Sequence, residues 1–286
     1  MGFIAALAAE PKPLQPASVK VYLHGLKHWN KLTCGSNYAE GPRVEMTMKG
    51  YTRFFARGRK PRLPITTAIL ATGASIIDLA KPSGAQFWAA ITLCVFALLR
   101  ISELLDLSSL DVSFEPGEVE CMVITIKKSK KDQYRKGVVL RVYAMVATPD
   151  ICPVRAVRRW LAMRQSFGAT GTCLWKKTSA TKALTRVVFT DRLRQFMQTF
   201  AERNQMDWDA TQFSGHSPRR GGATSLYAAG VAADVIRVLG RWKSECYKLY
   251  LETPLLLVRS AQEKMAQLVF AQVWPTAPNA WDREVP

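Results

Sequence analysis

The sequence has few of the side chains from which metal sites and disulfide frameworks are built. Its 286 residues include three histidines and six cysteines, and no two cysteines form a C-x-x-C pair. This distribution predicts neither a zinc site nor a disulfide framework, and it favours a reducing compartment. His24 and His28 lie four residues apart, but the sequence between them lacks a glutamate and no third ligand is near. We interpret both as helix-surface residues and predict no metal and no cofactor.

The sequence also lacks an apolar run long enough to cross a bilayer. The most apolar stretch, "FWAAITLCVFALL" at residues 87–99, is shorter than the roughly 20 residues that a spanning helix needs. It therefore predicts a buried core helix and no membrane span. The opening "MGFIAALAAE" has neither a basic region nor a small-residue cleavage site, which argues against a secretion signal.

Acidic residues are scarce relative to basic ones. The chain has 40 lysines and arginines against 22 aspartates and glutamates, which gives a net charge of +18. The excess is spread along the whole length, which is the electrostatic footprint of a protein that docks on nucleic acid. A mitochondrial or membrane-surface protein is the alternative that charge alone leaves open.

Apolar periodicity divides the chain into two predicted domains. Residues 1–58 contain three short helical patterns. The following stretch "RGRKPRLPIT", residues 57–66, has two prolines, four cations and no apolar period, so it predicts an extended linker. The larger domain is then residues 59–286.

Helical patterns cover most of the larger domain, including residues 65–80 and 87–107. A period of two at residues 119–128 and 137–144 predicts two strands that flank a charged loop. The predicted fold class is therefore mainly α with a small antiparallel β-sheet (α+β), and the hairpin has a basic tip.

Two arginines of the larger domain are candidates for anion binding. Arg100 follows the most apolar helix in "LLRISELLDL", with Glu103 one turn later. Because burying a guanidinium is costly without a compensating anion, Arg100 either pairs with Glu103 or contacts a ligand phosphate.

The second candidate, Arg219, follows His216 by one turn in "GHSPRRGGAT". Ser217 is the predicted cap, and the glycine pair would let another backbone approach closely. A helix start favours anions, so Arg219 is placed to fork onto phosphate oxygens while His216 donates beside it. The alternative is a solvated capping turn.

These motifs occur in an order that resembles the tyrosine recombinases, the phage-integrase family. The family pattern is an arginine in an "LLRxSELLxL" setting, a lysine in a β-hairpin, an H-x-x-R pair, a later histidine or tryptophan, and a tyrosine eight or nine residues after it. The matching segments are "LLRISELLDL", "KKSKKDQ", "GHSPRRGGAT", "GRW" and "YKLYL". The amino-acid sequences of these segments are especially similar to those of integrases of eukaryotic mobile elements. Residues 17–60 resemble the family's core-binding domain, shortened by at least one helix.

The resemblance implies a metal-independent DNA strand transferase that forms a 3′-phosphotyrosyl intermediate. The side chains that it assigns to catalysis are Arg100, Lys130, His216, Arg219, Trp242 and Tyr250, with Glu103 in support. Tyr247 is the alternative nucleophile. The hairpin lysine is ambiguous within the run, and the family's "SK-x-D-Q" pattern favours Lys130. The cations assigned to DNA contacts are Lys127, Lys128, Lys131, Arg220, Arg241 and Lys243.

The resemblance also implies partners and a compartment. It predicts double-stranded DNA, a homotetramer on that DNA, and a C-terminal helix that docks on a neighbouring protomer or packs on its own domain. The nucleus or the bacterial cytoplasm is the expected location. The alternative functions are a type IB topoisomerase-like or hairpin-resolving enzyme, and a catalytically decayed DNA-binding protein. The full set of catalytic residue types argues against decay.

Overall fold

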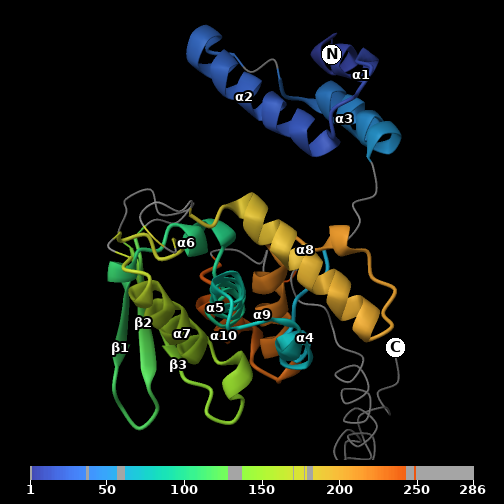
Figure 1. Ribbon diagram of the computed structural model, residues 1–286. Coiled ribbons are helices and arrows are strands. Elements are labelled where there is room, and N and C mark those ends of the chain that lie inside the picture. Colours follow the sequence, from blue (N-terminus) through green and yellow to red (C-terminus); the bar gives the residue numbers. More distant parts are fainter. Residues whose placement is uncertain are drawn as a thin grey trace, which may run out of the picture. The chain divides into compact units, whose positions relative to one another are not determined.

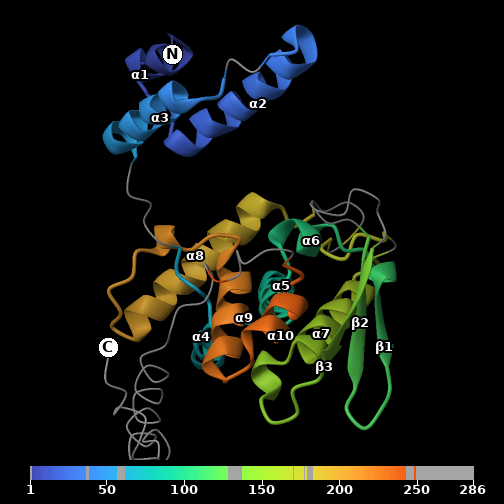
Figure 2. The same cartoon turned by 180° about the vertical axis from the view of Figure 1, so that it is seen from behind.

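The structure of the chain is a computed structural model that describes residues 2–36, 39–56, 62–127, 137–169, 171–176, 178, 183–242 and 248. The chain divides into two compact units, residues 1–61 and 62–286. Figures 1 and 2 show their elements from opposite sides. None of the described helices is both long and apolar enough to cross a bilayer.

The described part of the first unit consists of helices α1 (Gly2–Ala9), α2 (Pro16–Cys34) and α3 (Pro42–Phe55), as the sequence predicts. Prolines begin α2 and α3, where a missing N–H group costs no helical hydrogen bond. The core of this unit is small and consists of Ile4, Val19, Met48 and Tyr51.

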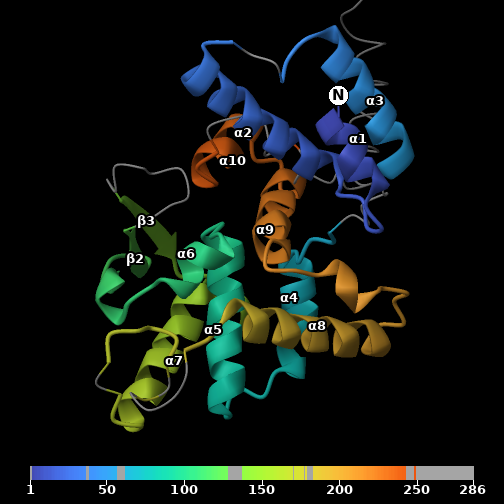
Figure 3. The ribbon, with the colours of Figure 1, turned by 90° about the horizontal axis from the view of Figure 1, so that it is seen from above.

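The second unit is built around helix α5 (Pro82–Phe96), which is buried without interruption from Ala85 to Val95. It packs against α7 (Pro153–Ser166) and α9 (Ser217–Ala228), and Figure 3 shows it between the other helices of the unit. The sequence prediction of a buried core helix is therefore confirmed, but the helical segment predicted at residues 87–107 is divided by a turn at Leu98, where φ is 48°. Helix α8 (Arg186–Arg203) contributes Phe189, Leu193 and Phe196 to the same core.

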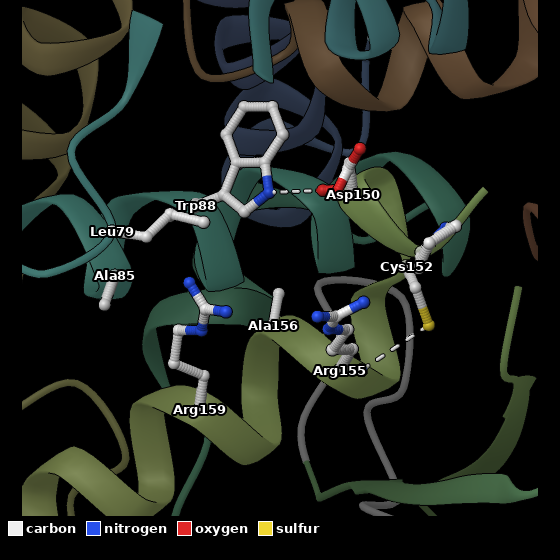
Figure 4. Close-up of a pocket in the computed structure, with 9 residues that line it drawn as sticks. Leu79, Ala85, Trp88, Asp150, Cys152, Arg155, Ala156 and Arg159 are labelled. Carbon is white, nitrogen blue, oxygen red and sulfur yellow. Dashed lines mark hydrogen bonds between the residues drawn. The ribbon is translucent and has the colours of Figure 1, made fainter. Parts of the chain in front are cut away.

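Helix α5 is linked to the start of α7 by a hydrogen bond from a buried tryptophan. The indole N–H of Trp88 donates a hydrogen bond to the Asp150 carbonyl at 2.9 Å, just before α7 (Figure 4). The sulfur of Cys152 caps α7 by accepting from the Arg155 backbone N–H at 3.5 Å. Figure 4 also shows the small Ala156 facing this junction, so the two helices can approach closely.

An antiparallel sheet lies at one edge of the second unit, beside α7 (Figures 1 and 2). Its strands, in spatial order, are β1 (Val112–Glu115), β2 (Cys121–Ile126) and β3 (Val138–Tyr143). The β2–β3 pair confirms the predicted hairpin, with Val123 opposite Arg141. The sequence did not predict β1, because four residues are too few to show a period and the strand depends on its pairing with β2. With this sheet, the predicted fold class is confirmed.

Residues 65–80 differ from the single predicted helix. Helix α4 covers only Thr67–Gly73, and a short 3-10 turn follows at Ala74–Ile76. Beyond it, the Asp78 side chain accepts a hydrogen bond from the Ala80 N–H at 3.0 Å. This local bond favours a turn over a continued helix.

The predicted linker also differs in part. Its residues 57–61 lie outside the described residues, whereas residues 62–66 are extended and packed on the second unit. The Leu63 and Ile65 N–H groups donate to the carbonyls of Gln212 and Ser217 at 3.1 and 3.0 Å, and Ile65 is fully buried. Gly221 of α9 makes room for this segment, because a Cβ atom there would lie 1.7 Å from the Ile65 carbonyl oxygen.

Gly221→Ala is therefore expected to destabilise the second unit, although alanine normally stabilises a helix by about 1 kcal/mol relative to glycine. We expect the free energy of unfolding, measured by urea denaturation, to fall by about 2–3 kcal/mol as residues 62–66 are displaced. Gly171→Ala is the matched control, because nothing lies within 4 Å of its added Cβ atom. If both variants were as stable as the parent, the close approach of Ile65 to α9 would not matter to the fold.

Candidate functional site

The turn after α5 presents a backbone carbonyl to two arginines. Leu98 has a φ of 48°, in the left-handed region that costs an L-residue roughly 1–2 kcal/mol. Its side chain packs against Ala223 and Ile236, which holds this conformation. Its carbonyl oxygen accepts one hydrogen bond from Arg219 Nη1 and another from Arg241 Nη2, the latter at 3.3 Å. The strained turn thus places one strong acceptor between two guanidinium groups.

Helix α6 (Ile101–Leu105) supplies the carboxylate of the site. Arg100 is its N-cap residue, and Glu103 Oε2 accepts from the Arg100 backbone N–H at 3.0 Å while Oε1 accepts from Arg100 Nη1. Glu103 Oε2 also accepts from Arg241 Nη2 at 2.7 Å, and the Glu103 side chain is only 1% exposed. Of the two interpretations that the sequence left open for Arg100, its pairing with Glu103 is present in the structure.

Arg219 is the most deeply buried of the three arginines, at 1% exposed. Its Nη1 and Nη2 atoms donate to the carbonyls of Leu98 and Gly240. Its guanidinium carbon lies 4.4 Å from the centre of the Trp242 ring, a cation–π contact that stabilises the buried charge. Arg100, Glu103, Arg219 and Arg241 are called the arginine cluster below.

Glycines allow these elements to approach one another. A Cβ atom on Gly222 would lie 2.2 Å from the Val95 carbonyl oxygen, so α9 can pack directly on the end of α5. This confirms the close approach predicted for the glycine pair. Helix α10 (Ala233–Leu239) ends at Gly240, where a Cβ atom would lie 1.6 Å from the Trp242 ring. No larger residue fits at either position without displacing part of the site.

Burial dominates the electrostatics of the arginine cluster. It lowers the pKa of Arg219 to about 10, an effect that Arg100 and Arg241 strengthen and Glu103 opposes. Burial also lowers the pKa of Arg241, which Glu103 partly offsets. For Glu103, burial raises the pKa, but Arg241 and Arg100 outweigh it and hold the pKa below its ordinary value. At neutral pH the cluster therefore has three positive charges and one negative charge, a net charge of +2.

The start of α9 differs from the prediction in its cap. His216 is the N-cap residue and Ser217 is the first helical residue. The Ser217 hydroxyl instead accepts from the Ser214 backbone N–H at 3.0 Å, which closes the turn before the helix. His216 is exposed, whereas Arg220 is partly buried.

The other predicted residues fall into two groups. Lys127, just after β2, lies 2.6 Å from a carboxylate oxygen of Asp111. Outside the described residues lie Lys128, Lys130, Lys131, Lys243, Tyr247, Tyr250 and the predicted C-terminal helix. The structure therefore brings together Arg100, Glu103, Arg219 and Trp242, and the nucleophile and the hairpin lysine stay predictions.

Sequence reasoning missed part of the cluster. It grouped Arg241 with general DNA contacts, whereas the structure places its guanidinium on Glu103. It did not identify the carbonyls of Leu98 and Gly240, because a backbone acceptor has no sequence signature. The signal available for Arg241 was its position directly after Gly240, at the end of an apolar helical pattern.

The residue types of the cluster are suited to a phosphate rather than a metal. Guanidinium groups donate planar pairs of hydrogen bonds that match phosphate oxygens, and a net charge of +2 favours an anion. Within the described ranges, no three His, Cys, Asp or Glu side chains lie close enough to share a metal ion. His24 and His28 are both exposed on α2, in agreement with their interpretation as surface residues.

Two solved structures have a fold similar to that of this chain. The integrase of the Tn1549 transposon, solved with circular intermediate DNA, superposes with a TM-score of 0.59 at 16% identity, covering 90% of this chain and 82% of that one. The XerH site-specific recombinase, solved with palindromic difH substrate in a post-cleavage complex, gives 0.56 at 15% identity over 89% and 71% of the two chains.

Sequence comparison extends the likeness from fold to family. An integrase/recombinase XerD homolog of Selenomonas ruminantium is 31% identical over 193 residues, which is 67% of this chain and 53% of that protein. The chain thus spans about half the length of this curated relative. The model of the phage integrase family matches residues 69–248, more than half of the chain, and confirms the resemblance seen in the motifs. The chain therefore belongs to the phage integrase family.

Proposed function

We propose that this chain is a site-specific DNA recombinase that cleaves and rejoins DNA strands through a covalent 3′-phosphotyrosyl intermediate. The observation that carries the proposal is the arginine cluster, which joins Arg100 to the sequence-distant Arg219. Arg100 and Arg241 both donate to Glu103, and Arg241 and Arg219 both donate to the Leu98 carbonyl. A phosphodiester resists attack because its anionic oxygens repel the nucleophile, and a positively charged site removes that barrier.

The proposed reaction uses the tyrosine as the nucleophile. The Tyr250 oxygen attacks the phosphorus atom, a bond forms between them, and the bond from phosphorus to the 5′ oxygen breaks. His216 takes the phenolic proton, and Lys130 protonates the departing 5′ oxygen. The phosphotyrosyl linkage conserves the bond energy, so a 5′ hydroxyl of a partner strand can reverse the step without ATP.

The two arginines have distinct settings for this task. Arg100 has a side chain that is 16% exposed, and Glu103 fixes it from one side. Arg219 donates from two guanidinium nitrogens to the carbonyls of Leu98 and Gly240. A guanidinium has five N–H groups, and in the proposed reaction the remaining ones would donate to a phosphate oxygen. The Trp242 ring contacts the Arg219 guanidinium through a cation–π interaction.

Double-stranded DNA is the proposed partner. The net charge of +18 supports phosphate contacts along the duplex, which make affinity steeply dependent on salt. We further propose a homotetramer on two duplexes, with the C-terminal helix docked on a neighbouring protomer. The catalytic unit and the small helical unit would bind the duplex together as a clamp.

Tyr250→Phe is expected to abolish covalent attachment, because phenylalanine has no oxygen to attack phosphorus. The DNA site is first selected as the duplex that the parent retains from a randomised pool. The parent is then incubated with a nicked form of that duplex, and SDS-stable protein–DNA adducts are counted. Tyr247→Phe is the matched control and should form adducts at the parental level. If Tyr250→Phe forms adducts and Tyr247→Phe does not, the nucleophile is Tyr247, and if the parent forms none, the proposed function is wrong.

Arg100→Lys is expected to slow adduct formation by about 10²-fold or more, because lysine keeps the charge but cannot donate the planar fork. The rate is measured in a single turnover with protein in excess over nicked DNA. Arg203→Lys, at an exposed position in the last turn of α8, is the control and should leave the rate unchanged. A parental rate for Arg100→Lys would exclude a forked phosphate contact by this residue.

A further inference from the structure

Arg241 has a buried donor atom that the folded chain does not satisfy. Its Nη2 atom donates to Glu103 and to the Leu98 carbonyl, whereas Nη1 is buried without a hydrogen-bond partner. Leaving such a group unpaired in the interior is unfavourable, and more so when it is charged. Only 15% of the side chain is exposed, so water is a poor substitute partner.

The backbone at Arg241 is also costly for an arginine. The Arg241 N–H donates to the Val238 carbonyl at 2.9 Å, and the Trp242 N–H donates to the Arg237 carbonyl at 3.0 Å. This pair of bonds is the Schellman ending of α10, in which the left-handed residue is usually glycine. Arg241 occupies it with a φ of 56°, a conformation that is unfavourable for a residue with a Cβ atom. Strain of this kind is typical of positions where the side chain has a function.

The charge of the cluster points to the same residue. Glu103 is the carboxylate that pairs with both Arg100 and Arg241. Without Arg241 the cluster would have a net charge of +1, which matches a phosphodiester in its ground state. With Arg241 the net charge is +2, which matches the two negative charges that develop when a phenolate adds to the phosphodiester. A site complementary to the transition state rather than the substrate accelerates the chemical step.

We propose that Arg241 is a third phosphate-contacting arginine, which donates through Nη1 to a non-bridging oxygen of the scissile phosphodiester and binds the transition state more strongly than the substrate. The inference rests on the proposed function and adds a residue to it. In the step concerned, the bond from the Tyr250 oxygen to phosphorus forms, the bond from phosphorus to the 5′ oxygen breaks, and Arg241 exchanges no proton.

The test makes two separate changes. It removes the Arg241 guanidinium from the protein, and it removes the negative charge of the scissile phosphate from the DNA. Arg241→Gly keeps the ending of α10, because glycine adopts the left-handed conformation without strain, and Glu103 retains Arg100. Single-turnover adduct formation is measured on the nicked duplex and on a duplex with an uncharged methylphosphonate at the scissile position. On the phosphate we expect a loss of about 10²–10³-fold with little change in the DNA dissociation constant. On the methylphosphonate we expect the parent and the variant to differ by less than about tenfold.

Arg237→Gln is the matched control, because Arg237 is an exposed arginine of α10 and should give the same small effect on both substrates. Arg241→Lys repeats the comparison if Arg241→Gly does not fold. Equal losses on phosphate and methylphosphonate would mean that Arg241 only positions its neighbours, which overturns the inference. So would a parental rate on the phosphate. If the parent itself forms no adduct on either substrate, the proposed function fails first and the inference with it.

Discussion

The carboxylate of Glu103 is the contact on which the rest of the site depends. It is almost fully buried, it closes the first turn of α6 through the Arg100 N–H, and it binds the guanidinium groups of Arg100 and Arg241. Without it, three guanidiniums would share an interior region with no compensating carboxylate from the described residues, which is far more costly than the loss of one ion pair. Buried ion pairs add little to stability when compared with apolar packing. A cluster with a surplus of two positive charges is therefore better explained by a ligand than by the fold.

Backbone geometry fixes the positions of these charges. The left-handed residues Leu98 and Arg241 lie at the ends of α5 and α10, and the Leu98 carbonyl accepts from both Arg219 and Arg241. Gly222 allows α9 to contact the end of α5 directly. The acceptors that hold Arg219 and Arg241 are thus the Leu98 and Gly240 carbonyls, at the ends of α5 and α10, and the Glu103 carboxylate of α6. Such a site needs little rearrangement when charge develops on a bound phosphate, which is the condition for electrostatic catalysis.

The sequence was informative wherever local periodicity decides the structure. It predicted the buried helix α5, the three helices of the first unit and the β2–β3 hairpin, because apolar spacing records which face is buried. It did not predict β1 or the packing of residues 62–66, because both depend on partners distant in sequence. The sequence predicted the pair of Arg100 with Glu103 as one of two alternatives, because the two residues lie one helical turn apart. It did not predict the burial of Arg219, because that burial depends on the tertiary contact of α9 with α5 and on backbone acceptors.

The surplus charge also links binding to folding. Three guanidiniums around one carboxylate repel one another in the free protein, and the lowered pKa of Arg219, which burial causes in the first place, includes that repulsion from Arg100 and Arg241. An anion bound at the cluster offsets the repulsion, so it stabilises the folded chain by an amount that rises with the logarithm of its concentration relative to its dissociation constant. In the proposed reaction, the excess positive charge that makes the free site unfavourable would therefore favour the species with the most negative charge. The left-handed conformations of Leu98 and Arg241 have a related effect. The folded chain already holds these strained residues in place, so binding an anion would not have to impose the strain.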